Sequence, residues 1–308
     1  MTDDQVFLTY NVGDPIRLDK FLVEQLPAFS RSQLQDLIRD GAVSLDGILA
    51  RKAGQMVEGE GVITVQLPAP PNLELVPEAI TLDLVYEDNE LMIVNKPAGM
   101  VVHPAAGHTT GTLVHAALAH SPELRTLADS QRPGIVHRLD KSTSGLIIIA
   151  KNETAQQWLQ EQFRLRKVNK TYLALVDGHP PTPDGRIETP IGRSATSRKQ
   201  MAVVPPQKGR NAITEYHTLE RFTRHTFLEV HPITGRMHQI RIHLDFIGCP
   251  VVGDTVYGLR KPSLPLKRYF LHAMRLSITL PGETEPRTFI AELPDELSQH
   301  LDNLKYNQ

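Results

Sequence analysis

Four prolines within eleven residues interrupt the first third of the chain. Residues 68–78 read PAPPNLELVPE. Proline fixes its own backbone torsion, lacks an N–H donor and restricts the residue before it, so neither a helix nor a central strand runs through such a stretch. We therefore predict a linker at 68–78, which separates a small domain at 14–67 from a larger domain at 79–300.

The composition is compatible with two folded domains. Of the 308 residues 40% are hydrophobic, which argues against extensive disorder. The formal net charge of -2 does not indicate a nucleic-acid binder, so such a role has to rest on local charge. The single cysteine, Cys249, excludes an intramolecular disulfide. Because no apolar stretch approaches the ~20 residues of a membrane span, and the N-terminus lacks a secretory pattern, we expect a cytoplasmic protein without membrane contact.

The small domain carries clear helix and turn signals. Apolar residues at helical spacing predict a helix over 18–26. Ser30, with Gln33 three residues later, forms a capping-box pattern for a second helix that Gly41 would end. Asp46-Gly47 is a hairpin signal. The predicted strands are at 43–45 and 62–65, the second of them after a glycine-rich turn at 58–61.

The larger domain is predicted to be rich in strands. Thr154 and Gln157 resemble a capping box, which starts a helix over 154–163. Within it we expect Trp158 to belong to the core rather than to stack on a base. The spacing of apolar residues in 234–248 favours a helix, although alternation within 240–244 would fit a strand almost as well. We further predict a helix at 113–118 and strands at 84–86, 91–94, 146–150, 172–176 and 226–230.

A lone carboxylate stands out at the entry to one of these strands. Residues 137–146 read HRLDKSTSGL, in which Asp140 lies between Arg138 and Lys141 and precedes a buried apolar run. An isolated aspartate in a loop is commonly a turn or cap residue. A loop packed against a sheet can nevertheless aim and hold a side chain, so Asp140 is a candidate catalytic residue.

Cofactor and metal sites are not expected. Four histidines fall within 103–120, but no carboxylate or cysteine lies among them at metal-ligand spacing. The chain also has no phosphate-binding glycine loop. One segment, 186–210, is instead strongly basic. A solvated loop is possible, but a polyanionic partner explains the local charge better. The basic residues of this segment are Arg186, Arg193, Arg198, Lys199, Lys208 and Arg210.

Three strings of the larger domain resemble one family. HRLDKSTSGL at 137–146, LMIVNKPAGMVVHPAAGH at 91–108 and TGRMHQIRIHLDFIG at 234–248 are similar to motifs of the pseudouridine synthases of large ribosomal RNA. The HPAAGH form leans toward the D-type branch. The resemblance covers most of 84–280 and implies an α+β fold with a largely antiparallel sheet and an active site in a central basic cleft. GDTVYG at 253–258 also matches, and we interpret it as structural.

The small domain resembles the RNA-binding domain first described in ribosomal small-subunit protein four. The matching strings are RLDKFL at 17–22, SRSQLQDLIRDGAV at 30–43 and VEGEGVITV at 57–65. In that domain the second helix and the turn before it face RNA, where cations and free helix N–H groups bind phosphates. An ordinary solvated helix face is the alternative. The implied RNA contacts are Lys20, Ser30, Arg31 and Arg39.

The resemblance to the pseudouridine synthases implies roles for five residues of the larger domain. Asp140 would be catalytic, and Arg241 would pair with it. Arg138 would help to extrude the target uridine, while Ile240 packs in the site. Tyr172 would lie against the target base, where it could stack or transfer a proton, and the sequence does not choose between these roles. From the basic segment, the expected RNA contacts are Arg193, Arg198 and Lys199.

The implied activity is isomerisation of uridine to pseudouridine in large-subunit ribosomal RNA, without a cofactor. RNA is the expected partner, and no obligate protein partner is evident. Two alternatives stay open, namely a synthase for transfer RNA and a non-catalytic RNA-binding factor for ribosome assembly. A glycoside hydrolase fits less well, since that class generally uses two opposed carboxylates, and no second acid occurs in a comparable motif.

Overall fold

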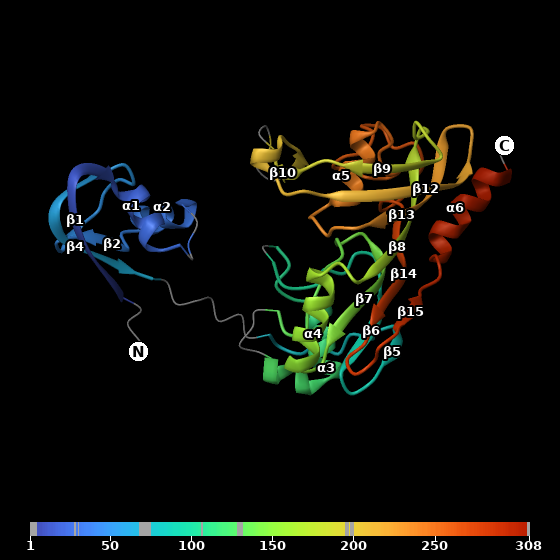
Figure 1. The fold of residues 1–308 in the computed structure, drawn as a ribbon, viewed down its shortest axis with the longest axis horizontal. Coiled ribbons are helices and arrows are strands. Elements are labelled where there is room, and N and C mark those ends of the chain that lie inside the picture. Colours follow the sequence, from blue (N-terminus) through green and yellow to red (C-terminus); the bar gives the residue numbers. More distant parts are fainter. Residues whose placement is uncertain are drawn as a thin grey trace. The chain divides into compact units, whose positions relative to one another are not determined.

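The protein consists of two compact units, Met1–Glu74 and Leu75–Gln308, seen in a computed structural model (Figure 1). Within the described ranges, every helix is too short or too polar to cross a bilayer. The structure describes residues 5–27, 29, 31–67, 75–105, 107–127, 132–194, 197 and 200–306.

The N-terminal unit packs two helices on a four-stranded antiparallel sheet of order β1-β4-β2-β3. Both predicted helices and the predicted hairpin are confirmed, since Asp46 and Gly47 have positive φ between the two short strands. The capping role predicted for Ser30 lies outside the described residues. The elements are β1 (Gln5–Arg17), α1 (Leu18–Gln25), α2 (Arg31–Arg39), β2 (Val43–Leu45), β3 (Ile48–Leu49) and β4 (Met56–Gln66).

Two features of this unit differ from the sequence prediction. The long strand β1 was missed, because its residues are half-exposed and give a weak alternation. The prediction of a glycine-rich turn at 58–61 was wrong, since these residues lie inside β4 and pair with β1. Gly61 makes room there: a Cβ would collide with Asp46 and with the hydroxyl of Tyr10, which donates a 2.8 Å hydrogen bond to Asp46.

The larger unit is built on a nine-stranded mixed sheet of order β5-β6-β7-β14-β8-β13-β12-β9, with β15 paired to β14. All its strand pairs are antiparallel except β7 with β14, so the expected α+β fold is confirmed. The strands are β5 (Leu84–Glu87), β6 (Leu91–Lys96), β7 (Ser144–Ala150), β8 (Asn169–Asp177), β9 (Asp184–Glu188), β12 (Ile213–Arg221), β13 (His225–Pro232), β14 (Leu271–Thr279) and β15 (Pro286–Ile290).

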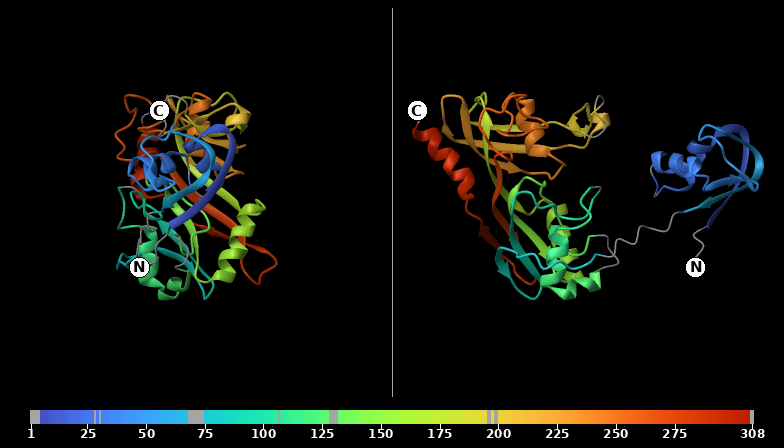
Figure 2. Two further views of the ribbon diagram at one scale, coloured as in Figure 1. Left: turned by 90° about the vertical axis from the view of Figure 1, so that its left-hand side faces the viewer. Right: turned by 180° about the vertical axis from the view of Figure 1, so that it is seen from behind.

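Helices cover both halves of this sheet. Figure 1 shows α3 and α4 beside β6 and β7, and α5 beside β12 and β13. The helix α6 packs Leu297 and Leu301 against Leu175 and Phe270 and runs along the outside of the sheet (Figure 2). A short separate hairpin joins β10 to β11. The bounds are α3 (Leu113–His120), α4 (Glu153–Arg164), β10 (Ile191–Arg193), β11 (Met201–Val203), α5 (Gln239–Phe246) and α6 (Asp295–Tyr306).

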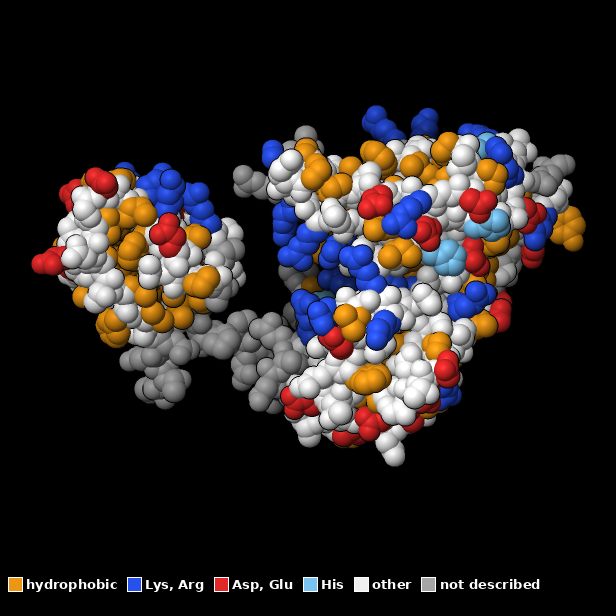
Figure 3. All heavy atoms as spheres, viewed as in Figure 1, with side chains coloured by type: hydrophobic (Ala, Val, Ile, Leu, Met, Phe, Trp, Pro, Cys, Tyr) orange, Lys and Arg blue, Asp and Glu red, His pale blue; other side chains and the backbone are white. Residues whose placement is uncertain are grey.

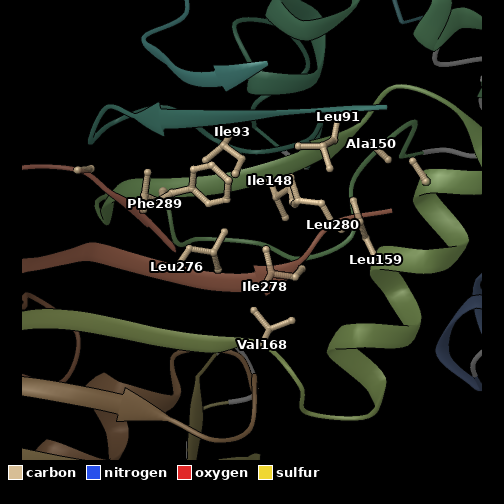
Figure 4. Packing of buried hydrophobic residues seen from close by; sticks show 13 residues of the cluster. Leu91, Ile93, Ile148, Ala150, Leu159, Val168, Leu276, Ile278, Leu280 and Phe289 are labelled. Carbon is tan, nitrogen blue, oxygen red and sulfur yellow. The ribbon is translucent and has the colours of Figure 1, made fainter. Parts of the chain in front are cut away.

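Strand β7 anchors the loop that carries Asp140. All seven of its residues are buried, and its two faces enter different cores, which explains the uninterrupted apolar run in the sequence. Ile148 packs between Ile93 and Leu276 on one face (Figure 4). Each such buried side chain contributes roughly 1.5–3 kcal/mol. The preceding loop therefore starts from a rigid element.

Gly145 permits the one parallel pairing of the sheet. Its φ is +110°, and a Cβ there would overlap the carbonyl of Ala273 on β14. One residue earlier, Ser144 Oγ shares a buried 2.9 Å hydrogen bond with His272 Nδ1. These contacts bring the start of β7 close to β14, which lies 128 residues further along the chain.

The helices of the larger unit contradict two sequence predictions and resolve a third that was ambiguous. Asn152, not Thr154, caps α4, because its side chain accepts from the backbone N–H of Ala155 at 2.9 Å. Trp158 is not a core residue: it is 38% exposed, and its indole donates to the Thr279 carbonyl at 3.1 Å. The ambiguous stretch 234–248 contains the helix α5, as its apolar spacing favoured.

Candidate active site

A basic cleft of about 570 Å³ opens in the larger unit between the end of α4, the loop before β7 and the segment that enters α5. Figure 3 shows Lys and Arg side chains gathered around this hollow. Among the described residues that line it, Asp140 is the only carboxylate. The cationic lining residues are Arg138, Arg164, Arg166, Lys170, Arg236 and Arg241.

Asp140 is held by a tight turn. Its carbonyl accepts from the backbone N–H of Thr143 at 3.1 Å, and the carbonyl of Lys141 accepts from the N–H of Gly99 at 2.7 Å. The side chain of Asp140 is 18% exposed, so it is shielded from bulk water yet open to the cleft.

Lys96 stabilises this turn through hydrogen bonds of its ammonium group. It is fully buried, and its Nζ donates to the carbonyls of Pro97 and Met100 at 2.8 and 2.9 Å. A longer bond of 3.4 Å reaches the carbonyl of Lys141. Burial lowers the pKa of Lys96 to about 7, against the opposing pull of the Asp140 charge. Lys96 therefore ties the end of β6 to the loop of Asp140.

Arg241 on α5 joins two carboxylates. Its Nη1 donates to Asp140 Oδ2 at 3.0 Å, while Nε and Nη2 donate to the two oxygens of Asp254 at 2.6 and 2.9 Å. Burial opposes the charge of Asp254, but Arg241 and two backbone N–H groups hold the pKa of that carboxyl below its usual value. The bidentate contact fixes the guanidinium and aims its third nitrogen at Asp140.

Two tyrosines complete the setting of Arg241. Its guanidinium carbon lies 4.4 Å from the ring centre of Tyr269 and 5.0 Å from that of Tyr257, both within cation–π range. The hydroxyl of Tyr269 also donates to Asp140 Oδ2 at 3.4 Å. Both donors meet Oδ2, so Oδ1 of Asp140 has no partner among the described residues.

The remaining expected residues of the larger unit line the same cleft. Arg138 is exposed, Ile240 is 7% exposed, and Tyr172 lies half-buried on β8. Burial, aided by the charge of Asp140, raises the pKa of Tyr172, so its phenol stays protonated. The structure thus places Arg138, Asp140, Tyr172, Ile240 and Arg241 around one cavity.

The basic segment is less one-sided than its sequence suggested. Arg193 ends β10 and is exposed. Arg186 instead donates to Glu215 of β12 at 2.6 Å and also contacts Glu188, so its charge is compensated locally. The predicted contacts Arg198 and Lys199 lie outside the described residues. Within the described ranges, no group of three or more His, Cys, Asp or Glu side chains could hold a metal ion.

In the N-terminal unit, the expected RNA contacts lie on two helices. Lys20 on α1 is exposed, and Arg39 on α2 is exposed and paired with Asp36 at 2.9 Å. Arg31 donates to the fully buried carboxylate of Asp19 at 2.7 Å. The fourth expected contact, Ser30, lies outside the described residues.

Sequence reasoning missed several residues of the site. Asp254 belongs to the string at 253–258 that was interpreted as structural, although it holds Arg241 directly. Lys96 lies within the string at 91–108, but no role was assigned to it, and Tyr269 gave no signal beyond its residue type. Their contacts with the Asp140 loop span 45 and 129 residues. His238, whose Nε2 lies 4.0 Å from Asp140 Oδ2, was also overlooked.

Comparison with known families gives two matches. Residues 90–246 match the family model for RNA pseudouridylate synthase, and residues 16–63 match that of the S4 domain. The first covers the loop of Asp140, the strand β8 and the helix α5. The second covers both helices of the N-terminal unit.

Curated relatives extend over nearly the whole chain. An uncharacterized RNA pseudouridine synthase of Bacillus subtilis is 42% identical over 94% of this chain and 95% of its own length. The ribosomal large subunit pseudouridine synthase D of Neisseria meningitidis is 43% identical over 94% of this chain and 79% of its own. That of Zymomonas mobilis is 39% identical over 96% of both chains.

Solved structures agree with these matches. Human RNA Pseudouridylate Synthase Domain Containing 4 has a TM-score of 0.57 and 26% identity, covering 72% of this chain and 92% of its own. Human RNA Pseudouridylate Synthase Domain Containing 1 has a TM-score of 0.53 and 26% identity, covering 76% of this chain and 98% of its own. The chain therefore belongs to the RNA pseudouridine synthase family, is an enzyme of that class, and carries an S4 RNA-binding domain.

Proposed function

We propose that this enzyme isomerises specific uridines of large-subunit ribosomal RNA, with Asp140 as the catalytic carboxylate and without a cofactor. The bond from the sugar to the uracil nitrogen breaks, the base rotates, and a ring carbon joins the sugar. One observation carries the proposal. Asp140 is the only carboxylate among the described residues that line the cleft, and Arg241 contacts it at 3.0 Å.

The choice of ribosomal RNA draws on the relatives. Two of them, at 39% and 43% identity over most of this chain, are named as large-subunit synthases. The HPAAGH string at 103–108 and the small domain proposed at 14–67, joined to the catalytic domain at 79–300 by the linker 68–78, point the same way.

The chemistry requires an ionised carboxylate. Asp140 attacks the sugar directly or removes a sugar proton to form an elimination intermediate, and both routes start from its charged form. Arg241 favours that form by donating to it from a buried position, where a charge-assisted hydrogen bond is stronger than in water.

The target base has to leave its stack to reach Asp140, which costs a few kcal/mol. Arg138, exposed at the cleft, is proposed to fill the vacated space, and Ile240 to pack against the extruded nucleotide. Tyr172 contacts the base. Its raised pKa favours a protonated phenol, so we propose a packing role for its ring rather than proton removal by a phenolate.

Phosphate contacts outside the cleft are proposed to supply much of the affinity. In the N-terminal unit, Asp19 holds the guanidinium of Arg31 while half of that side chain stays exposed, which leaves it available to RNA. The proposed contacts there are Lys20, Ser30, Arg31 and Arg39, and those of the larger unit are Arg193, Arg198 and Lys199.

Mapping of pseudouridines tests the substrate. The wild-type protein is incubated with unmodified large-subunit ribosomal RNA and, separately, with unmodified transfer RNA. We expect new pseudouridines in the ribosomal RNA alone. Sites only in transfer RNA would contradict the proposed substrate, and an absence of new sites in both RNAs would show that neither is the substrate.

A further inference from the structure

His238 occupies a strained backbone position beside Asp140. It is the residue before α5, and its φ of 57° and ψ of 19° lie in the left-handed region. Such a conformation is unfavourable for a residue with a Cβ. The side chain is 27% exposed and lines the cleft together with Asp140 and Tyr172. Strain retained in a cleft suggests a use for that side chain.

The hydrogen bonds of His238 assign its tautomer. Tyr257 Oη accepts from the backbone N–H of Met201 at 3.2 Å and lies 2.9 Å from His238 Nδ1. Among the described residues, the phenol proton of Tyr257 has no acceptor other than Nδ1, so this bond is assigned with the phenol as donor. The ring proton of a neutral imidazole is then on Nε2.

Nε2 of His238 faces the catalytic carboxylate without bonding to it. The distance to Asp140 Oδ2 is 4.0 Å, which is too long for a hydrogen bond. Burial lowers the pKa of His238, and Arg241 and Arg138 add to this effect, while Asp140 and Asp254 oppose it. A neutral donor thus points into the space that a nucleotide against Asp140 would enter.

We propose that His238 is a catalytic residue whose Nε2–H donates a hydrogen bond to a carbonyl oxygen of the target uracil. When the bond between the sugar and the uracil nitrogen breaks, its electron pair stays with the base and spreads onto the carbonyl oxygens. The hydrogen bond stabilises this charge in a shielded site. The proton remains on His238, and an electron pair of the base forms the new carbon–carbon bond to the sugar. The ring carbon then loses its hydrogen as a proton, the freed nitrogen takes up a proton, and Asp140 is released as the carboxylate, so atoms and electrons balance.

This inference rests on the proposed function and is tested on the RNA that the wild-type enzyme modifies. Single-turnover rates of pseudouridine formation, dissociation constants for that RNA and urea unfolding are measured for His238→Leu and His238→Gln. We expect the leucine variant to lose about 100-fold in rate with unchanged RNA binding. Glutamine retains an N–H donor of similar reach, so it recovers most of the rate.

A second pair of variants separates catalysis from folding. Glycine adopts left-handed torsions freely, so His238→Gly is expected to unfold no more readily than wild type yet to react as slowly as the leucine variant. Tyr257→Phe keeps the ring beside Arg241 but frees Nδ1, and we expect a smaller decrease in rate.

Three results would overturn the assignment of His238. These are a wild-type rate for His238→Leu, a loss confined to RNA binding, or equal losses in the leucine and glutamine variants. Any of them, obtained with an active wild-type enzyme, leaves the proposed function intact. If the wild-type enzyme forms no pseudouridine in ribosomal RNA, the proposed function fails, and this inference fails with it.

Discussion

At the scale of single residues, the site depends on a buried arginine shared by two carboxylates. The side chain of Arg241 is 5% exposed and that of Asp254 is fully buried. Burying either charge without the other would lower the stability of the folded protein. Asp140 lies at the open end of this arrangement, and within the described part of the chain only the Oδ2 of its carboxylate accepts a hydrogen bond. The structure thereby distinguishes a fully buried carboxylate that holds the arginine from one that faces the cleft.

Removing the holding carboxylate should destabilise the protein. We expect Asp254→Asn to lower the free energy of unfolding by about 3–5 kcal/mol, because it leaves the buried guanidinium of Arg241 poorly compensated. Urea unfolding measures this. The matched control is Asp36→Asn, which breaks the exposed pair with Arg39 and should change stability by less than about 1 kcal/mol. Equal effects of the two substitutions would contradict the account.

Arg138 should matter for turnover rather than for folding. We expect Arg138→Ala to reduce the rate of pseudouridine formation about tenfold or more, since losing ~1.4 kcal/mol of support for the extruded base corresponds to one factor of ten. Arg224→Ala, an exposed arginine outside the cleft lining, serves as the control in the same assay. A wild-type rate for Arg138→Ala would reject its proposed role.

At the scale of elements, the C-terminal end of α4 carries a strained arginine that adds a positive charge to the cleft. Arg166 has a φ of 57°, and the N–H groups of Arg166 and Lys167 donate to the carbonyls of Phe163 and Gln162. This pattern closes helices with a left-handed residue, for which glycine is preferred. Here the position carries an arginine that lines the cleft.

Replacing that arginine by glycine should move stability and RNA binding in opposite directions. We expect Arg166→Gly to gain about 1 kcal/mol in unfolding free energy, because the left-handed penalty disappears. RNA affinity should fall, and its dependence on the logarithm of salt concentration should become shallower by about one. Arg166→Ala, which keeps the strain, should lose the same affinity without the gain in stability. Unchanged salt dependence in both variants would show that Arg166 does not contact phosphate.

Elements were predictable from the sequence where periodicity or turn chemistry was strong. The buried strand β7, the helix α5 and the hairpin at Asp46 followed from local patterns. The half-exposed β1 and the cap of α4 did not, since tertiary packing decided them. The motifs brought Asp140 and Arg241 together as candidates, and the two side chains lie in contact, while their chemical roles stay predictions. Asp254, Tyr269 and Lys96 escaped because only the folded chain brings them to the site.

At the scale of the whole molecule, one buried and one half-buried histidine link stability to pH. Burial lowers the pKa of His103 to about 4 and that of His137 to about 3. His137 also accepts the backbone N–H of Ile148 on β7, which requires an unprotonated Nε2. Between these values and the ordinary pKa of about 6.5, the unfolded chain binds protons that the folded protein does not.

Stability should therefore decrease as the pH falls below about 6.5. Each of these histidines contributes a slope of up to about 1.4 kcal/mol per pH unit in this window. Urea unfolding between pH 7.5 and about 5, where most carboxylates remain ionised, measures the slope. A variant with His103→Gln and His137→Gln should show a shallower slope. The same slope in that variant and in the wild type would contradict the assignment.

Asp140 is proposed to perform the chemistry, and the substitution Asp140→Asn is the sharpest test of that role. Asparagine keeps the size of the side chain and an oxygen to accept from Arg241, but it has no negative charge to attack the sugar or take its proton. The measurement is pseudouridine formation in unmodified large-subunit ribosomal RNA under single-turnover conditions, with RNA binding measured in parallel. We expect the variant to bind the RNA and to form no pseudouridine, whereas the wild-type enzyme forms it. Turnover by Asp140→Asn at the wild-type rate would show that the charge of Asp140 is not required for the reaction.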